Sequence, residues 1–207
     1  MPLYKTIAPN SQTTVKIWKI TESYEELMQL LDLNDESLLR VSSMKSAIHK
    51  RGFLSIRHLL REFDYTDKDL YYDENGKPHL KDGKFISISH SFIFSGIIIS
   101  EVPVGIDIEK QRSKIKLIAK KFVDYESQYL SDSDEEYIRK LTLIWCIKES
   151  LYKLYATPGL SFKLHTLVLP FMIEDQSTKS WIDYNNDKKD FNSEYLEFDG
   201  FSCAYVI

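Results

Sequence analysis

The stretch VGIDIEKQ, residues 104–111, places two carboxylates one residue apart in an otherwise apolar run. Side chains of a strand alternate between its two faces, so Val104, Ile106 and Ile108 are predicted to share a buried face. Asp107 and Glu109 then share the opposite, solvated face. Like charges that lie side by side repel one another, so the stretch predicts a strand that presents its acids to a positive charge.

A hard divalent cation such as Mg²⁺ could bind both Asp107 and Glu109 and remove their repulsion. Mg²⁺ typically takes one or two protein carboxylates and completes its octahedron with waters and phosphate oxygens. On these residues alone, two solvated acids on an edge strand remain the alternative.

Alternating polar and apolar residues predict further strands on both sides of this stretch. The stretches 13–20 and 85–91 alternate in this way, and the end of the chain, FSCAYVI, reads as a strand. Residues 95–109 read as two strands joined by a short turn at 101–103, which together would form a hairpin.

Helical patterns are interspersed with these strands. Ser23 and Glu26 have the spacing of a capping box and predict a helix start. Apolar residues recur at helical spacing through 39–63, and 132–159 contains the clearest helix, which Pro158 and Gly159 should end. Strands and helices that alternate irregularly predict an α+β fold.

The composition is that of an ordinary globular protein. The chain has 207 residues, of which 43% are hydrophobic and 28% charged, and its net charge is −4. The acidic balance argues against a protein whose main task is to grip nucleic acid. Cys146 and Cys203 lie in apolar surroundings and predict buried free thiols in a reducing compartment. No apolar run reaches membrane-spanning length and the first residues lack a signal-peptide core, so we expect a cytoplasmic protein with no membrane contact.

A second set of candidate functional residues lies on the long predicted helix. Trp145, Glu149 and Lys153 are spaced four residues apart and form one stripe, with Lys148 beside Glu149. Glu149 could serve as a third metal ligand or as a base, with the lysines directed at phosphates. An ordinary helical salt pair between Glu149 and Lys153 is the alternative.

Other candidates are weaker on their own. Ser89 and His90 stand where a strand ends, and a histidine there can donate to phosphate oxygens. Arg51 and Lys77 are cations of a kind that usually belong to a solvated surface.

Four segments occur in a characteristic order: GKP (76–78), ISISHS (86–91), VGIDIE (104–109) and WCIKESLYK (145–153). Together they closely resemble the signatures of the 4'-phosphopantetheinyl transferase superfamily. The length is similar to that of the longer, surfactin-synthetase-associated type, a monomer built as a pseudo-dimer. The resemblance implies two similar halves, roughly 1–100 and 101–207, each with a small antiparallel sheet packed by helices.

The resemblance also implies the reaction. Enzymes of this family move the 4'-phosphopantetheine group of coenzyme A to a serine of an apo acyl or peptidyl carrier protein, and adenosine 3',5'-bisphosphate is the other product. By the resemblance, the Mg²⁺ ligands are Asp107, Glu109 and Glu149, and the catalytic residues are Glu149 and Lys153. The residues that it implies for coenzyme A are Arg51, Lys77, Pro78, Ser89, His90, Lys148 and Lys153.

Carrier proteins of this sort present an acidic helix beside the serine, so their partner should offer a basic and apolar surface. In the family, the stretch between the two signatures often belongs to the carrier-docking region. Lys120, Lys121 and Phe122 are our candidates for docking here, and a plain amphipathic helix is the alternative.

Two other functions remain open. Asp107, Glu109 and Lys110 superficially resemble the carboxylate and lysine sites of some metal-dependent nucleases, although the acidic charge argues against this. The chain could also be a non-catalytic carrier-binding module of the same fold, although the intact acids and Lys153 argue against lost chemistry.

Overall fold

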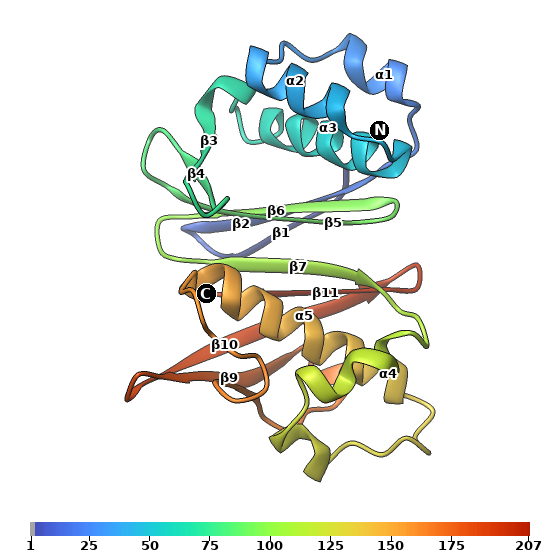
Figure 1. Cartoon of the computed structure of the whole chain (residues 1–207), viewed down its shortest axis with the longest axis vertical. Helices are drawn as coiled ribbons and strands as arrows, with labels where there is room; N and C mark the ends of the chain where they lie inside the picture. The colour runs from blue at the N-terminus through green and yellow to red at the C-terminus, as the bar shows by residue number, and fades with distance from the viewer. Residues whose placement is uncertain (1–2) are drawn as a thin grey trace. The chain divides into compact units, whose positions relative to one another are not determined.

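The computed structural model describes residues 3–207. The chain divides after Val102 into two compact units, residues 1–102 and residues 103–207. Each unit combines antiparallel sheet with helices, which confirms the predicted α+β class (Figure 1). The pseudo-symmetry of the two halves stays a prediction. Within residues 3–207, no helix is long and apolar enough to cross a membrane.

The first unit contains six strands, three α-helices and one short 3-10 helix among its described residues. In chain order these are β1 (Leu3–Asn10), β2 (Thr13–Lys19), α1 (Tyr24–Gln29), α2 (Asp35–Ser43), α3 (Ala47–Arg61), η1 (Asp67–Asp69), β3 (Leu70–Tyr72), β4 (Pro78–Leu80), β5 (Phe85–Ser91) and β6 (Phe94–Ser100).

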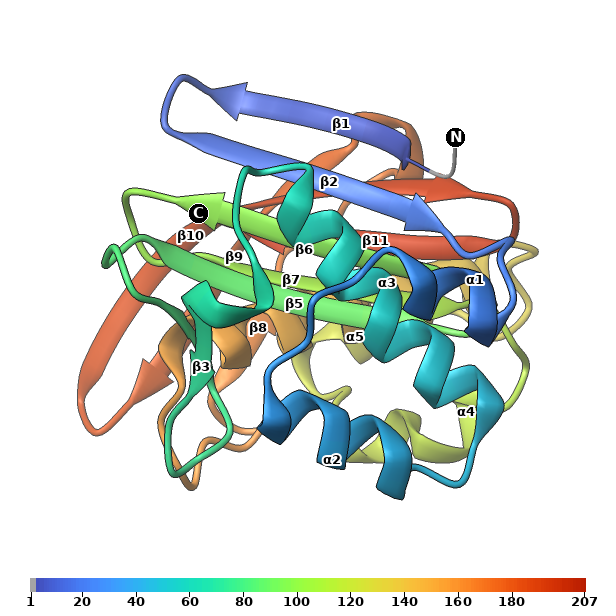
Figure 2. The same cartoon turned by 90° about the horizontal axis from the view of Figure 1, so that it is seen from above.

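The four longer strands form an antiparallel sheet in the order β1-β2-β6-β5, and β3 pairs with β4 separately. Figures 1 and 2 show α1, α2 and α3 together on one side of the larger sheet. Leu54, Leu59 and Leu60 of α3 are completely buried in a core that also contains Ile97 of β6. The capping box predicted at Ser23 and Glu26 is present and opens α1.

The second unit contains the remaining strands and the longest helix. In chain order its elements are β7 (Gly105–Lys110), α4 (Ile115–Ile118), η2 (Ala119–Lys121), η3 (Tyr125–Gln128), α5 (Tyr137–Tyr155), β8 (Thr166–Val168), η4 (Ile173–Asp175), β9 (Ser177–Tyr184), β10 (Asp187–Phe198) and β11 (Phe201–Val206).

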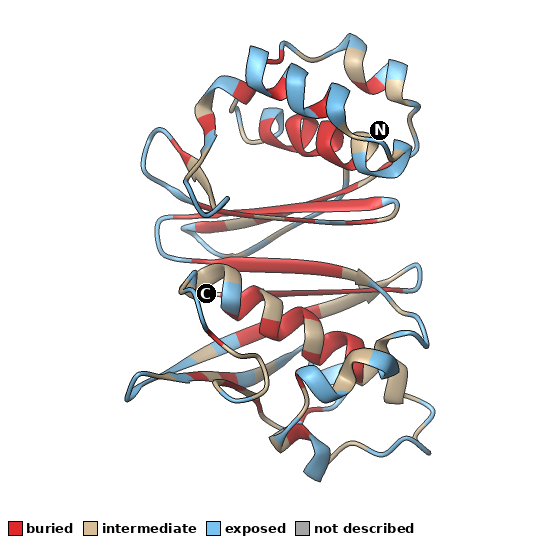
Figure 3. Ribbon diagram, viewed as in Figure 1, coloured by how far each residue is buried: buried red, intermediate tan, exposed pale blue. Residues whose placement is uncertain are grey.

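These strands form a five-stranded antiparallel sheet in the order β7-β11-β10-β9-β8. The helix α5 lies across β7 and β11, and the side that it turns to the sheet is buried (Figure 3). Leu141, Ile144 and Leu151 of α5 are completely buried in the core of this unit. The sheet therefore serves as the platform on which α5 is held.

The predicted hairpin over 95–109 is wrong, although both of its strands exist. In the first unit's sheet, β6 lies between β2 and β5, so both of its edges are already occupied. The strand β7 instead begins the second sheet and pairs with β11. The turn at 101–103 therefore contains the boundary between the two units.

The helical pattern through 39–63 belongs to two helices, because the chain is extended at Met44 and a new helix starts after the N-cap Ser46. The predicted helix at 132–159 is confirmed as α5, which is shorter than its pattern. It ends at Tyr155, where Ala156 adopts the left-handed conformation before Pro158 and Gly159.

Candidate active site

The candidate site of the second unit is built where α5 packs closely on β7 and β11. Gly105 lies directly against α5, since a Cβ at this position would come within 1.9 Å of the Ser150 carbonyl oxygen. The Ser150 hydroxyl donates to the Ala204 carbonyl oxygen at 3.0 Å, and the Cys146 thiol donates to that of Ser202 at 3.6 Å. Small residues thus bring the helix close to the sheet and fix its register.

This register brings Lys153 of α5 to Asp107 of β7. The Lys153 ammonium donates to Asp107 Oδ1 at 2.8 Å and to the Ile106 carbonyl oxygen at 2.9 Å. Asp107 is only 5% exposed, so the prediction that it lies on a solvated face is wrong. The reason is that α5 covers this part of β7, whereas Glu109 further along the strand is half-buried.

Glu149 lies within the electric field of both strand acids. The pKa of the Glu149 carboxyl is raised to about 7, mainly by burial and also by the negative charges of Asp107 and Glu109, against the opposing effect of the nearby Lys153. Desolvation and like charge both disfavour an ionised carboxylate. A carboxyl that titrates near neutral pH is well matched to accepting and returning a proton.

The pKa of Glu149 predicts a pH dependence for the stability of the metal-free protein. The native state retains a proton on Glu149 between its ordinary pKa of 4.5 and its raised value of about 7. The free energy of unfolding should therefore fall as the pH rises through this window. Denaturation in the presence of a chelator at pH 5 and pH 8 measures the free energy of unfolding at the two ends of this window. The Glu149→Gln variant should show a smaller difference between the two values. An equally steep dependence in the variant would contradict the assignment.

The donor set of the site suits magnesium in its chemistry. Three carboxylates are hard oxygen ligands, and their mutual repulsion is what a divalent cation would relieve. Their positions are not those of a coordination shell: across residues 3–207, no group of three or more His, Cys, Asp and Glu side chains is arranged to hold a metal ion. Asp107 Oδ1 instead engages Lys153. The residues therefore fit Mg²⁺ by charge and donor type. Coordination would require the Asp107 carboxylate to turn toward the ion, or to contact the ion and the Lys153 ammonium at the same time.

The assignment of Lys148 to coenzyme A is wrong. Its side chain is completely buried and forms an ion pair with the equally buried Glu126 at 2.8 Å. Its ammonium also donates to the carbonyl oxygens of Phe122, Phe162 and Thr166 at 2.6, 3.1 and 3.0 Å. An ammonium has only three hydrogens, so these partners saturate it and none is left for a phosphate.

Two residues assigned to coenzyme A in the first unit lie on neighbouring elements. Arg51 of α3 donates from Nη2 to the Ile20 carbonyl oxygen at 3.1 Å, and its buried Nε has no hydrogen-bond partner among residues 3–207. His90 of β5 lies against Gly52, the residue after Arg51, and a Cβ on Gly52 would come within 2.6 Å of His90 Cδ2. Arg51 and His90 thus share one region of the first unit, where an anion could satisfy the Arg51 Nε–H.

The other residues assigned to coenzyme A in this unit lie on strands or directly before one. Ser89 is buried on β5, next to His90. Lys77 follows the turn at Gly76, where φ is +81°, and Pro78 begins β4. Burial lowers the pKa of the Lys77 ammonium, against the opposing effect of Asp73. Their roles toward coenzyme A stay predictions.

The structure also corrects the docking prediction. Phe122 is completely buried in the core of the second unit, where its ring meets that of Trp145 edge-on, so it cannot contact a partner. Lys120 and Lys121 are exposed, and Leu117 near them is 73% exposed. The predicted alternative of one amphipathic helix is also wrong, because the segment is divided among three short helices, α4, η2 and η3.

Sequence reasoning missed two glycines that position candidate residues. Gly52 lies in the middle of α3, where glycine is unfavourable unless close packing requires it, and this is the signal that could have found it. Gly105 stands in the quoted motif, yet its contact partner Ser150 lies far away in the chain. Nothing local in the sequence links the two.

The fold and the site together define a class of protein. Acids suited to a hard cation, a near-neutral carboxyl and a lysine are the groups that phosphate-transferring enzymes use to neutralise charge and move a proton. Residues 103–206, half of the chain, match the family model described as the 4'-phosphopantetheinyl transferase superfamily. The chain belongs to this superfamily, and its enzyme class is that of a phosphopantetheinyl transferase.

Two curated relatives are similar over much of the chain. The 4'-phosphopantetheinyl transferase gsp of Aneurinibacillus migulanus is 27% identical over 178 residues, which cover 82% of this chain and 72% of the relative. The enterobactin synthase component D of Salmonella typhi is 34% identical over 131 residues, which cover 61% of this chain and 56% of the relative. The matched part of the chain thus spans little more than half of the length of that second relative.

Proposed function

We propose that this chain transfers the 4'-phosphopantetheine group of coenzyme A to a serine of an apo carrier protein, with Mg²⁺ held by Asp107, Glu109 and Glu149. The serine oxygen would form a bond to the phosphorus that carries the pantetheine arm. The bond from that phosphorus to the bridging oxygen would break, and adenosine 3',5'-bisphosphate would leave. The observation that carries the proposal is that the contact of β7 with α5 joins Lys153 to Asp107 and places Asp107 and Glu109 near enough to Glu149 to raise its pKa.

The two catalytic candidates of the second unit, Glu149 and Lys153, have surroundings that support their roles. Glu149, whose pKa is raised to about 7 by burial and by the two strand acids, would accept the serine proton, because a hydroxyl is a poor nucleophile until a base removes its proton. Lys153 would offset the charge that develops on the phosphate oxygens. A bound Mg²⁺ would supply further neutralisation of the diphosphate.

The first unit would contribute to coenzyme A binding through Arg51, Lys77, Pro78, Ser89 and His90. The packing of His90 on Gly52 supports an anion there, as does the buried Arg51 Nε, which has no hydrogen-bond partner in the described part of the chain. We also propose the longer, pseudo-dimeric type of the family, acting as a monomer in the cytoplasm.

The contact between Gly52 and His90 gives a specific prediction. Gly52→Ala should raise the KM for coenzyme A by about tenfold, the equivalent of one charged hydrogen bond, because the methyl group would displace the His90 ring. Alanine stabilises a helix interior relative to glycine by about 1 kcal/mol, so unfolding is not the expected cause of the loss. Steady-state kinetics with coenzyme A varied, together with a thermal melt, measure both quantities. An unchanged KM in a folded variant would contradict the role of His90.

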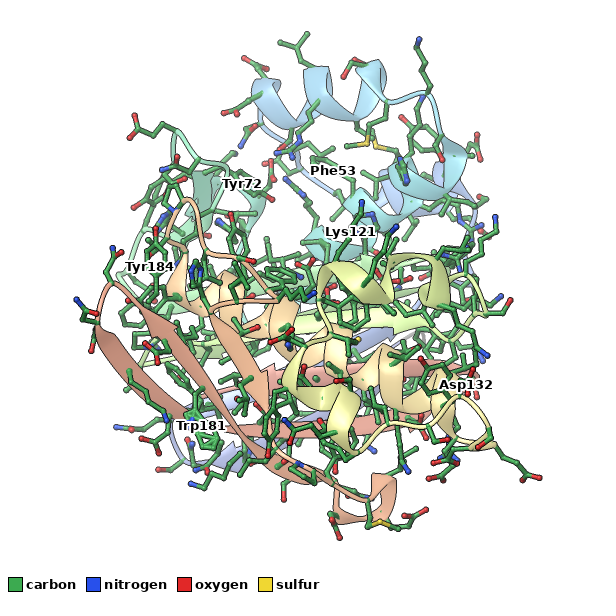
Figure 4. All side chains as sticks on the ribbon, turned by 60° about the horizontal axis from the view of Figure 1, so that its bottom comes forward. Phe53, Tyr72, Lys121, Asp132, Trp181 and Tyr184 are labelled. Carbon is green, nitrogen blue, oxygen red and sulfur yellow. The ribbon has the colours of Figure 1, made fainter. Side chains whose placement is uncertain are left out.

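Carrier docking would use the lysine-rich segment, residues 114–121. Its exposed members are Lys114, Lys116, Leu117, Lys120 and Lys121. Lys121, labelled in Figure 4, belongs to this yellow-green segment. Several lysines around an exposed leucine match the charge and the apolar side of an acidic amphipathic helix.

Reversing one of these charges tests the docking proposal. Lys121→Glu should raise the KM for carrier protein by about fivefold and leave the KM for coenzyme A unchanged, because a surface attraction becomes a repulsion. Lys179→Glu, which reverses an exposed lysine on β9, is the matched control. Equal behaviour of the two variants would exclude a docking role for Lys121.

The whole proposal is tested by incubating the chain with coenzyme A, Mg²⁺ and a panel of apo acyl and peptidyl carrier proteins. Mass spectrometry should show one added phosphopantetheine on at least one carrier, and no addition when a chelator is present. Binding of a carrier without modification would favour a non-catalytic module. Cleavage of nucleic acid with Mg²⁺ and no modification would favour a nuclease.

A further inference from the structure

The ion pair of Lys148 and Glu126 is the most deeply buried charge pair in the described part of the chain that the proposed reaction does not use. Both side chains are 0% exposed. Buried ion pairs contribute little net stability, because desolvation offsets most of their attraction. The arrangement of this pair therefore points to a purpose other than stability.

The pair joins three stretches of the second unit. Lys148 belongs to α5. Its ammonium holds the Phe122 carbonyl oxygen, which precedes α5, and the Phe162 and Thr166 carbonyl oxygens, which follow it. All three carbonyls would lose a charged donor if the pair were removed.

Glu126 holds the same stretches from the other side. Its Oε1 accepts from the Val168 backbone N–H at 2.9 Å, and its Oε2 accepts from the Asp124 N–H at 3.2 Å. The two side chains thus fix both irregular stretches, 122–126 and 162–168, to the helix.

The first of these stretches leads directly from the lysine-rich segment. Lys121 is followed by the completely buried Phe122, whose backbone and ring are both held on α5, at Lys148 and Trp145. The same helix carries Glu149 and Lys153. The segment that would receive the carrier is therefore fastened to the helix that would act on its serine.

We infer that Lys148 and Glu126 form a positioning clamp that holds the carrier-docking segment in register with the catalytic end of α5. This inference rests on the proposed function. It assigns Lys148 a role in carrier use and none in direct contact with coenzyme A.

The test uses Glu126→Gln in the full chain, because glutamine keeps the size of the side chain while removing the charge. Amide hydrogen exchange in residues 114–130 should accelerate by at least about tenfold, as expected for a lost charged hydrogen bond, while exchange in α5 stays within about threefold. The KM for carrier protein should rise by about tenfold with the KM for coenzyme A unchanged. Unchanged exchange in 114–130, or a rise of both KM values together, would overturn the clamp.

Lys163→Met is the matched control, because it breaks the exposed pair of Lys163 and Asp124, 3.8 Å apart, which links the same two stretches. It should change neither exchange nor kinetics. If Glu126→Gln does not fold, the double variant Glu126→Gln, Lys148→Met removes both charges at similar volume and should show the same changes. If the wild-type chain modifies no carrier, the proposed function fails, and the exchange measurement alone still decides whether the clamp exists.

Discussion

Glu149→Gln should lower kcat for phosphopantetheine transfer by about a thousandfold, the usual contribution of a general base. Glutamine keeps the shape of the side chain but can neither accept the serine proton nor supply a negative charge to a cation. The free energy of unfolding should not fall, because the ionised Glu149 is buried and repelled by Asp107 and Glu109. Single-turnover kinetics with saturating coenzyme A and carrier measure the effect.

Glu135→Gln is the matched control for this experiment. It is the same isosteric change at an exposed acid just before α5, and it should leave kcat unchanged. A folded Glu149→Gln enzyme with a kcat within a few-fold of the wild type would remove Glu149 from the reaction.

Gly105→Ala should destabilise the protein by about 3 kcal/mol and abolish measurable transfer. The new Cβ would lie 1.9 Å from the Ser150 carbonyl oxygen and 2.7 Å from its carbon, and both are backbone atoms that cannot turn aside. Overpacking of this kind is relieved only when the backbone shifts. Separation of β7 from α5 would draw Asp107 away from Lys153 and disperse the site.

Gly83→Ala separates this steric effect from the loss of glycine's flexibility. Gly83 has a φ of +87°, and no atom of the described residues lies within 4 Å of the place that a Cβ would take, so alanine there should cost about 1 kcal/mol through backbone strain alone. Denaturant unfolding and transfer assays should show a mild loss of stability with full activity. Full activity in Gly105→Ala would show that the contact of α5 with β7 does not build the site.

The individual strands and helices could be predicted from the sequence better than the pairing of the strands. The strands at 13–20 and 85–91 and the long helix are confirmed, because their hydrophobic periodicity is local. The hairpin over 95–109 failed because pairing depends on which strand edges are free, and both edges of β6 are taken by strands distant in the chain. Periodicity carries no information about such edges.

For the candidate site residues, too, the sequence predicts local features better than contacts between distant residues. The two motifs predict that acids from a strand and a helix converge on one ion. The pKa of Glu149 responds to Asp107 and Glu109, but no three acids within residues 3–207 are arranged to hold a metal ion, so the shared ion stays a prediction. The prediction for Lys148 is wrong because adjacent residues of a helix point about 100° apart, so Lys148 does not share the side of its neighbour Glu149. It follows Ile144 by four residues and precedes Leu151 by three, and this spacing places it on the buried side. Its partner Glu126 carried no signal in the sequence.

The central claim is that Asp107, Glu109 and Glu149 act together on one cation. Titration of the chain with Mn²⁺, followed by electron paramagnetic resonance, tests this without any substrate, because Mn²⁺ is a paramagnetic ion that prefers the same oxygen ligands as Mg²⁺. We expect one bound Mn²⁺ per chain that Mg²⁺ displaces, and binding at least about tenfold weaker in Glu109→Gln, in line with the loss of one charged ligand. Mn²⁺ binding that is equally tight in the wild type and in Asp107→Asn, Glu109→Gln and Glu149→Gln would contradict it.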